Sequence, residues 1–309
     1  MKAGMTLKDK LEAGMFVVTG ELGPPRGCNA EAVRKKAAMF RGVVDAVNIT
    51  DNQTAIVRMS SMAASFICIE EGIEPVMQMT VRDRNRIALQ SDLLGASALG
   101  IRNVLCLSGD HQSFGDQPGA RGVNDIDSIQ LVYTARRMCE DKKILHSDNP
   151  LSAAPDLFIG AACNPFAEPK EFRPMHLKKK IDAGAQFIQT QCVYDIPSFR
   201  EFMKKIVDMG LHEKACVLAG VMPLKSAGMA AYLNENVPGV AVPQSMINRL
   251  KGLPKDRVAG EGIELCCEII NELKEIEGVR GIHIMAIEWE HRVREIVERS
   301  GLDKRSVSS

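Results

Sequence analysis

The amino-acid sequence predicts an α/β fold, a single-domain (β/α)8 TIM barrel that takes in residues 1–309. Eight short apolar runs rich in β-branched residues recur along the chain, and segments with apolar residues at helical spacing separate them. Hydrophobic residues make up 45% of the chain, which is enough for one large core. Barrels of this kind commonly use roughly 250 residues as one domain.

The predicted strands are near-continuous apolar runs, a pattern typical of a sheet covered on both faces. They lie at residues 16–22, 46–50, 76–81, 103–108, 157–163, 187–193, 216–222 and 281–287. Helical spacing predicts helices at residues 30–40, 56–71, 84–99, 127–139, 169–183, 198–209 and 260–276. The alternation of strand and helix indicates βαβ units and a parallel sheet, and eight repeats favour closure into a barrel.

An open, doubly wound sheet is the alternative fold for the same alternation. Its sequence signatures are absent, because no GxGxxG follows the first predicted strand and the chain has no P-loop sequence. No linker or shift in composition divides the chain. Two loops, at residues 111–124 and 143–155, are long enough to be functional or mobile.

Composition and charge indicate which partners the protein does not favour and in which cell compartment it is expected. Basic and acidic residues number 39 each, so no global field favours nucleic acid or an anionic membrane. No apolar run reaches the roughly 18–20 residues that a membrane span needs. The nine cysteines are scattered without a CxxC pair, and the N-terminal segment lacks the apolar core of a signal peptide. We therefore expect reduced thiols, no intrinsic metal site and a cytoplasmic location.

Enzymes built on this barrel carry their sites at the C-terminal ends of the strands, and Glu21 ends the first predicted strand. A carboxylate at the end of an apolar strand, in a partly dry pocket, suits a general acid that works near neutral pH. A helix N-cap or an ion pair with Arg26 is the structural alternative for the same residue.

The third and fourth predicted strands end in loops that suit a ligand. Asp110 follows Gly109, and a glycine permits the backbone to approach a planar ring closely; an Asx turn is the alternative. The charged run at residues 82–86 suits a diphosphate at the N-terminus of the next helix. A solvated helix start with an aspartate N-cap is the alternative there.

Two amides share one face of the sixth predicted strand. Gln189 and Gln191 are two residues apart, so their side chains point the same way, into the barrel. An inward amide at the top of a barrel is more often a ligand contact than packing, because burying it unpaired is costly. His283 is interpreted as a core residue, and Trp289 as packing against the last helix.

Seven segments, in chain order, carry a resemblance to one family. They are VVTGELGPP (17–25), MTVRDRNR (79–86), VLCLSGD (104–110), GAACNPFAEP (160–169), LKKKIDAGAQFIQTQCVYD (177–195), AGVMP (219–223) and GIHIMAIEWE (281–290). On these segments the chain resembles the methylenetetrahydrofolate reductases. The resemblance spans nearly the whole chain, and the motifs are specific when taken together.

The resemblance implies a non-covalent flavin, FAD with FMN as the alternative, and reduction of 5,10-methylenetetrahydrofolate to 5-methyltetrahydrofolate. This reaction belongs to one-carbon metabolism, in methionine biosynthesis or the acetyl-CoA pathway. Glu21 would be the acid that helps open the methylene bridge, and Asp110 would tune the flavin and bind the pterin. Gln191, with Gln189 beside it, would contact the substrate. The implied flavin-binding residues are Thr50, Thr80, Arg82, Asp83, Arg84, Ser108, Gly109, Asp110, Asn164 and Lys180.

Several positions depart from the family pattern. Ser108 stands where an arginine is frequent, Ala227 where some members place a stacking phenylalanine, Arg173 at a position acidic in some members, and Glu288-Trp289 where others carry Asn-Arg. These changes resemble members from anaerobes that work with a partner subunit. We therefore expect electrons from NAD(P)H or from an iron–sulfur or zinc-containing partner subunit, and a homo-oligomer is a further expectation.

Two functions remain as alternatives to the reductase. One is a pterin-dependent methyltransferase on the same barrel, and the other is a non-catalytic subunit of a reductase complex. The ELGPP, RDRNR and TQ sequences favour the reductase over the first. The presence of Glu21, Asp110 and Gln191 favours it over the second.

Overall fold

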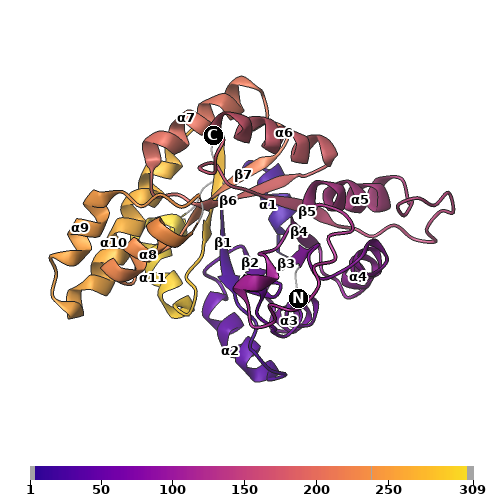
Figure 1. Ribbon diagram of the computed structural model, residues 1–309, viewed down its shortest axis with the longest axis horizontal. Helices are drawn as coiled ribbons and strands as arrows, with labels where there is room; N and C mark the ends of the chain where they lie inside the picture. The colour runs from indigo at the N-terminus through magenta and orange to yellow at the C-terminus, as the bar shows by residue number, and fades with distance from the viewer. Residues whose placement is uncertain (1–3, 238, 305–309) are drawn as a thin grey trace. The chain divides into compact units, whose positions relative to one another are not determined.

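A computed structural model describes residues 4–237 and 239–304 of the chain. Within this part, eight strands form a closed barrel in the order β1 to β8, and the pairs β1–β8, β2–β3, β3–β4, β4–β5 and β7–β8 are parallel. The (β/α)8 barrel is confirmed. Figure 1 labels most of its strands and helices. The strands are β1 (Val17–Leu22), β2 (Ala46–Ile49), β3 (Pro75–Thr80), β4 (Asn103–Leu107), β5 (Phe158–Cys163), β6 (Phe187–Cys192), β7 (Cys216–Val221) and β8 (Val279–Ile284).

Helices alternate with these strands, and none in the described part is long and apolar enough to cross a membrane. Those at the predicted places are α2 (Ala30–Phe40), α3 (Ser61–Glu70), α4 (Arg86–Ala98), α5 (Ser128–Glu140), α6 (Arg173–Ala183), α7 (Ile196–Asp208) and α10 (Lys255–Lys274). The helical spacing of apolar residues did not predict α1 (Leu7–Glu12), α8 (Ala227–Asn236), α9 (Gln244–Lys251) and α11 (Val293–Arg299).

Helix α3 begins five residues later than its apolar spacing predicts. Ile56, the first residue of the predicted helix, has extended backbone with φ of −99° and ψ of 130°, and Thr54 and Ala55 before it are left-handed, with φ of 58° and 55°. The helix begins instead after Ser60, whose side-chain oxygen accepts a hydrogen bond from the backbone N–H of Ala63 at 3.2 Å. The N-cap therefore sets the first residue of the helix, and the residues before it form a loop.

The chain divides into two compact units, and each is described by itself. Unit 1 consists of Met1–Gly20, Cys163–Lys178 and Ile188–Ser309. Unit 2 consists of Glu21–Ala162 and Lys179–Phe187. The single domain expected from the sequence stays a prediction.

Buried polar side chains of unit 1 face the barrel interior. Thr19 Oγ1 lies 2.9 Å from His283 Nδ1, and Gln189 Nε2 donates to Thr19 Oγ1 at 3.4 Å. Because β1 and β6 are not neighbours in the barrel, a contact between their side chains places both inside it. His283 is thus a buried, hydrogen-bonded residue of the interior, as its position in an apolar strand indicated.

The cysteines in the described part are free, and several are buried among apolar side chains. Burial raises the pKa of the Cys68 and Cys106 thiols to about 12 each. These thiols therefore stay protonated at neutral pH and act as small apolar groups in the core.

Two glycines of α10, two residues apart, give a matched test of the packing of this helix. A Cβ at Gly262 would lie 1.8 Å from the carbonyl oxygen of Leu224, whereas a Cβ at Gly260 would meet nothing within 4 Å. We expect Gly262→Ala to lower the free energy of unfolding by about 1–3 kcal/mol through overpacking. Gly260→Ala should raise it by about 0.5–1 kcal/mol, since alanine is the better helix former. Urea unfolding checks both, and equal stability of the two variants would contradict the contact.

Candidate functional site

Glu21 lies in unit 2 at the C-terminal end of β1, and its residue is only 7% exposed. Its Oε2 accepts a hydrogen bond from Gln78 Nε2 of β3 at 3.5 Å. Since β2 separates β1 from β3, this contact places both side chains inside the barrel. Asn29, and not Glu21, is the N-cap of α2, and Arg26 pairs with Asp116 at 2.5 Å.

Asp51, directly after β2, joins the ends of two strands. Its Oδ2 accepts from the backbone N–H and the hydroxyl of Thr80 at 2.9 and 3.0 Å. The guanidinium of Arg84 donates to both of its oxygens, at 2.7 and 3.1 Å. Two of the predicted cofactor-binding residues, Thr80 and Arg84, are thus held by one buried carboxylate that the sequence did not single out.

Arg82, at the end of β3, is buried and connects three loops. Its Nε and Nη2 donate to the carboxylate of Asp83 at 2.7 and 2.6 Å. Its Nη1 donates to the carbonyl oxygen of Asp110 at 3.0 Å, and Nη2 reaches that of Asn52 at 3.3 Å. The hydrogen bond from Arg82 lowers the pKa of the Asp83 carboxyl. Arg82 and Arg84 therefore both have carboxylate partners, and their diphosphate-binding role stays a prediction.

The loop after β4 brings Asp110 and Gly109 against the end of β3. Gly109 has φ of 85°, and a Cβ there would lie 3.1 Å from Thr80 Cβ and 3.2 Å from Arg82 Cβ. Only glycine fits this backbone and this space without strain. The next residue, Asp110, is exposed, and its Oδ2 accepts from the backbone N–H of Thr54 at 3.0 Å.

Three more predicted residues of unit 2 have distinct surroundings. Thr50, 1% exposed, has a hydroxyl oxygen with no hydrogen-bond partner among the described residues. Lys180 is buried, and its ammonium donates to the carbonyl oxygen of Ala162 at 2.6 Å. Ser108 is exposed and donates to the hydroxyl of Ser128 at 3.2 Å. A buried hydroxyl without a partner indicates a position where a ligand atom would complete the hydrogen bonding.

The remaining predicted residues belong to unit 1. Gln189 is buried and bonded to Thr19, and Gln191 is half-buried. Gln191 Oε1 accepts from the backbone N–H of Cys192 at 3.1 Å. Asn164 is also half-buried, and its Oδ1 accepts from the backbone N–H of Phe166 at 3.1 Å. The structure therefore places the two amides of β6 and Asn164 in one unit, and Glu21 and Asp110 in the other.

The sequence reasoning did not find Gln78 and gave Asp51 no role. Asp51 follows an apolar run directly, which marks it as a strand-end polar residue but does not reveal its partners. Gln78 is the single amide in the buried strand PVMQMT, and a lone polar residue in such a run is costly to bury without a partner.

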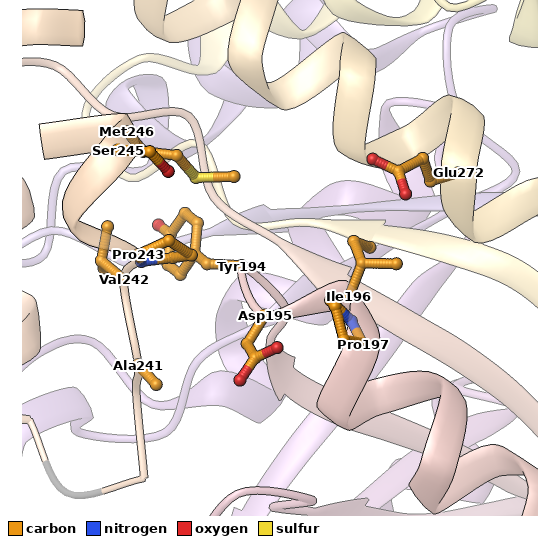
Figure 2. Close-up of a pocket in the computed structure, with 10 residues that line it drawn as sticks. All are labelled: Tyr194, Asp195, Ile196, Pro197, Ala241, Val242, Pro243, Ser245, Met246 and Glu272. Atoms are coloured by element: carbon orange, nitrogen blue, oxygen red, sulfur yellow. The ribbon is translucent and has the colours of Figure 1, made fainter. Parts of the chain in front are cut away.

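Two hollows lie on the described residues. The smaller, of about 130 Å³, is in unit 2 and is lined by Arg82 and Asp83 together with the loops at residues 52–57 and 112–120. The larger, of about 590 Å³, is in unit 1 between the start of α7, the segment at residues 241–246, and Glu272 (Figure 2). The larger hollow contains none of the predicted site residues, so its size alone does not make it the candidate site. Within the described residues, no group of three or more His, Cys, Asp or Glu side chains could hold a metal ion.

The loop after β8 carries one of the altered stretches of the sequence, Glu288-Trp289. Glu288 has left-handed backbone with φ of 54°, and Trp289 follows it. The Lys225 ammonium lies 5.4 Å from the centre of the Trp289 ring, and the Arg292 guanidinium lies 5.8 Å from it. Lys225 also donates to the carbonyl oxygen of Ile287 at 2.5 Å. Both cations lie within the roughly 6 Å over which a cation is attracted to the face of an indole ring, so they help hold the ring in place.

Comparison with known sequences gives a match over almost the whole chain. The profile of a family described as "Methylenetetrahydrofolate reductase" matches residues 6–301. The "Probable methylenetetrahydrofolate reductase (NADPH)" of Caenorhabditis elegans is 26% identical over 264 residues, which are 82% of this chain and 36% of that relative. The "5,10-methylenetetrahydrofolate reductase" of Salmonella typhimurium is 23% identical over 218 residues, 70% of this chain and 66% of the relative. The chain thus spans little more than a third of the nematode relative.

Solved structures show the same fold at low identity. One, described as "Uncharacterized protein from Clostridium thermocellum binds two copies of 5-methyl-5,6,7,8-tetrahydrofolic acid", has a TM-score of 0.66 at 16% identity and covers 96% of this chain and 99% of its own. An "F420-dependent secondary alcohol dehydrogenase" has a TM-score of 0.56 at 13% identity, covering 93% and 99%. At these identities the likeness concerns the fold alone.

The unpartnered hydroxyl of Thr50 gives a test of the site. Replacing it in Thr50→Val removes a buried, unsatisfied oxygen, so we expect the cofactor-free protein to gain about 1 kcal/mol of unfolding free energy. The control is Thr134→Val, because that buried hydroxyl donates to the carbonyl oxygen of Gln130 at 2.7 Å. It should lose about 1 kcal/mol. Urea unfolding without added ligand checks both, and a destabilised Thr50→Val would show that the hydroxyl has a protein partner after all.

Proposed function

Because the chain belongs to the methylenetetrahydrofolate reductase family, we propose that it reduces 5,10-methylenetetrahydrofolate to 5-methyltetrahydrofolate with a bound flavin. The observation that carries the proposal is Glu21, a buried carboxyl at the end of β1 within the matched region. The Clostridium thermocellum protein of similar fold, which is described as binding 5-methyl-5,6,7,8-tetrahydrofolic acid, supports a folate as the ligand.

The reaction needs one proton and one hydride. One carbon–nitrogen bond of the methylene bridge breaks, the released nitrogen takes the proton, and the bridge carbon takes the hydride. A flavin, when bound, supplies the hydride. Glu21 supplies the proton in this proposal, because a carboxyl in a largely dry strand-end position suits general acid catalysis.

Asp110 and the two amides bind the substrate in this proposal. The carboxylate of Asp110 is held in one orientation by the N–H of Thr54 and is exposed, so that it can accept hydrogen bonds from a pterin ring. Gln191 and Gln189 lie on one face of β6 and would offer amide groups to a folate. Each of these groups both recognises and orients the substrate, which is a large part of catalysis.

Two residues of unit 2 fit a flavin. Thr50 offers a buried hydroxyl without a partner among the described residues, and Lys180 offers a buried positive charge. We propose FAD because it is the flavin that the resemblance to the family implies. In the structure the arginines of the run at residues 82–86 pair with carboxylates, and the first N–H groups of α4 are bonded to Asn85 and Asp125. The mass of the flavin extracted from purified protein distinguishes FAD from FMN.

We further propose that electrons reach the flavin from a partner subunit that carries iron–sulfur clusters. Ala227 offers only a methyl group where a stacking ring would hold a nicotinamide, and the ring of Trp289 already contacts Lys225 and Arg292. Both observations concern the altered positions and weigh against direct NAD(P)H binding.

The electron donor can be tested on the purified, flavin-loaded protein. We expect NADH and NADPH to bleach the flavin absorbance slowly and reduced ferredoxin to bleach it rapidly, because a nicotinamide lacks its stacking surface. Stopped-flow spectroscopy measures the three rates under anaerobic conditions. Rapid bleaching by either nicotinamide would contradict the partner proposal and leave the folate-reducing half of the proposal intact.

The role of Glu21 is tested by Glu21→Gln, which keeps the shape and removes the acid. We expect the rate of folate reduction to fall by about 10²–10⁴, the usual contribution of a general acid. The bound flavin should still be reduced at the original rate by dithionite. Glu31→Gln, at an exposed carboxyl in the first turn of α2, controls for the change in charge. An unchanged folate rate in Glu21→Gln removes Glu21 from its assigned role.

A further inference from the structure

Gln78 stands out among the buried polar residues of unit 2. It lies in β3, a strand whose six residues are all buried, and it is 9% exposed. Its backbone carbonyl oxygen accepts a hydrogen bond from the hydroxyl of Ser61 in α3 at 2.7 Å. The position of β3 at this residue is therefore fixed from outside the barrel, while the side chain points inward to Glu21.

The direction of the contact follows from the chemistry of the amide. Gln78 Nε2 carries only donors, so Glu21 Oε2 must accept whether the carboxyl is ionised or protonated. When Glu21 holds a proton, this hydrogen bond favours the proton on Oε1, because the unprotonated carbonyl oxygen is the better acceptor. If residue 78 had no hydrogen-bond donor, this contact would no longer distinguish Oε1 from Oε2 of Glu21 as the site of the proton.

We propose that Gln78 is a positioning residue that keeps the acid proton of Glu21 on Oε1 and oriented for transfer. This inference rests on the proposed function of Glu21. Burying an amide costs free energy that an apolar side chain of the same size would not, so packing alone does not explain the residue. The 3.5 Å separation is long, and such contacts commonly tighten only when substrate is bound.

The test uses the flavin-loaded full chain in four forms: wild type, Gln78→Leu, Gln78→Glu and Gln90→Leu. Leucine removes the donor at similar volume, and glutamate replaces the donor with an acceptor at the same length. Gln90 is the matched control, a buried glutamine of α4 that donates to the carbonyl oxygen of Arg86 at 2.8 Å. Each protein is reduced with dithionite and mixed anaerobically with methylenetetrahydrofolate, and flavin reoxidation is followed.

We expect Gln78→Leu and Gln78→Glu to lower the limiting reoxidation rate about 10-fold or more, since a misplaced proton donor loses part of its effect. The half-saturating folate concentration should change less than the rate. The solvent deuterium isotope effect should rise, because proton transfer becomes more rate-limiting. Gln90→Leu should keep the wild-type rate and isotope effect even where its unfolding free energy falls.

A second measurement does not depend on turnover. The carbonyl stretching band of protonated Glu21, identified as the band lost in Glu21→Gln, should move to higher wavenumber in Gln78→Leu as its hydrogen bond is lost. Infrared difference spectra of the folded proteins record it.

The outcomes separate this inference from the function it rests on. If methylenetetrahydrofolate does not reoxidise the flavin of the wild-type protein, both the proposed function and the role of Gln78 are overturned. The role of Gln78 alone is overturned if Glu21→Gln is inactive while the Gln78 variants keep the wild-type rate, isotope effect and band position. If Gln78→Leu fails to fold, Gln78→Glu alone decides, and a wild-type rate in that variant contradicts the inference.

Discussion

The ionic and hydrogen-bonded contacts of the buried Asp51 carboxylate hold together the site end of unit 2. The Asp51 carboxylate accepts hydrogen bonds from the backbone N–H and the hydroxyl of Thr80 and from Nη1 and Nη2 of Arg84. It therefore fixes the end of β3 to the residues after β2. Removing the charge of Arg84 would leave the fully buried Asp51 carboxylate without its ion-pair partner, which is strongly destabilising. The neighbouring Arg82 then connects the Asn52, Asp83 and Asp110 loops from this fixed point.

The hydrogen bonds of Arg82 and Asp110 allow the loop after β2 to keep an unfavourable backbone conformation. Asn52, Thr54 and Ala55 all have positive φ, an unfavourable backbone for residues with side chains and most of all for the β-branched threonine. Such conformations persist only where the surroundings over-determine them. Here Arg82 bonds the carbonyl oxygen of Asn52 and Asp110 bonds the N–H of Thr54, so the loop is held at both ends.

Much of the fold could be predicted from the sequence, because each strand is a continuous apolar run and the repeats number eight. The start of α3 could not, since the backbone is extended at Ile56 and the helix begins only after its N-cap Ser60, which apolar spacing does not reveal. Glu21, Asp110 and Gln191 were predicted from their places at strand ends, and their roles stay predictions. Gln78 was not predicted and Asp51 was given no role, because their partners are distant in the chain: Glu21 is 57 residues from Gln78, and Arg84 is 33 residues from Asp51.

The lone hydroxyl of Thr50 has a consequence for the amount of protein in a cell. A folded chain that binds its ligand gains stability in proportion to the logarithm of ligand concentration over the dissociation constant, while the empty chain keeps a buried, unsatisfied oxygen. The empty form therefore unfolds more often and is more exposed to proteolysis. Where the flavin is the ligand, the level of this protein would follow the supply of the vitamin from which flavins are made, even at constant synthesis.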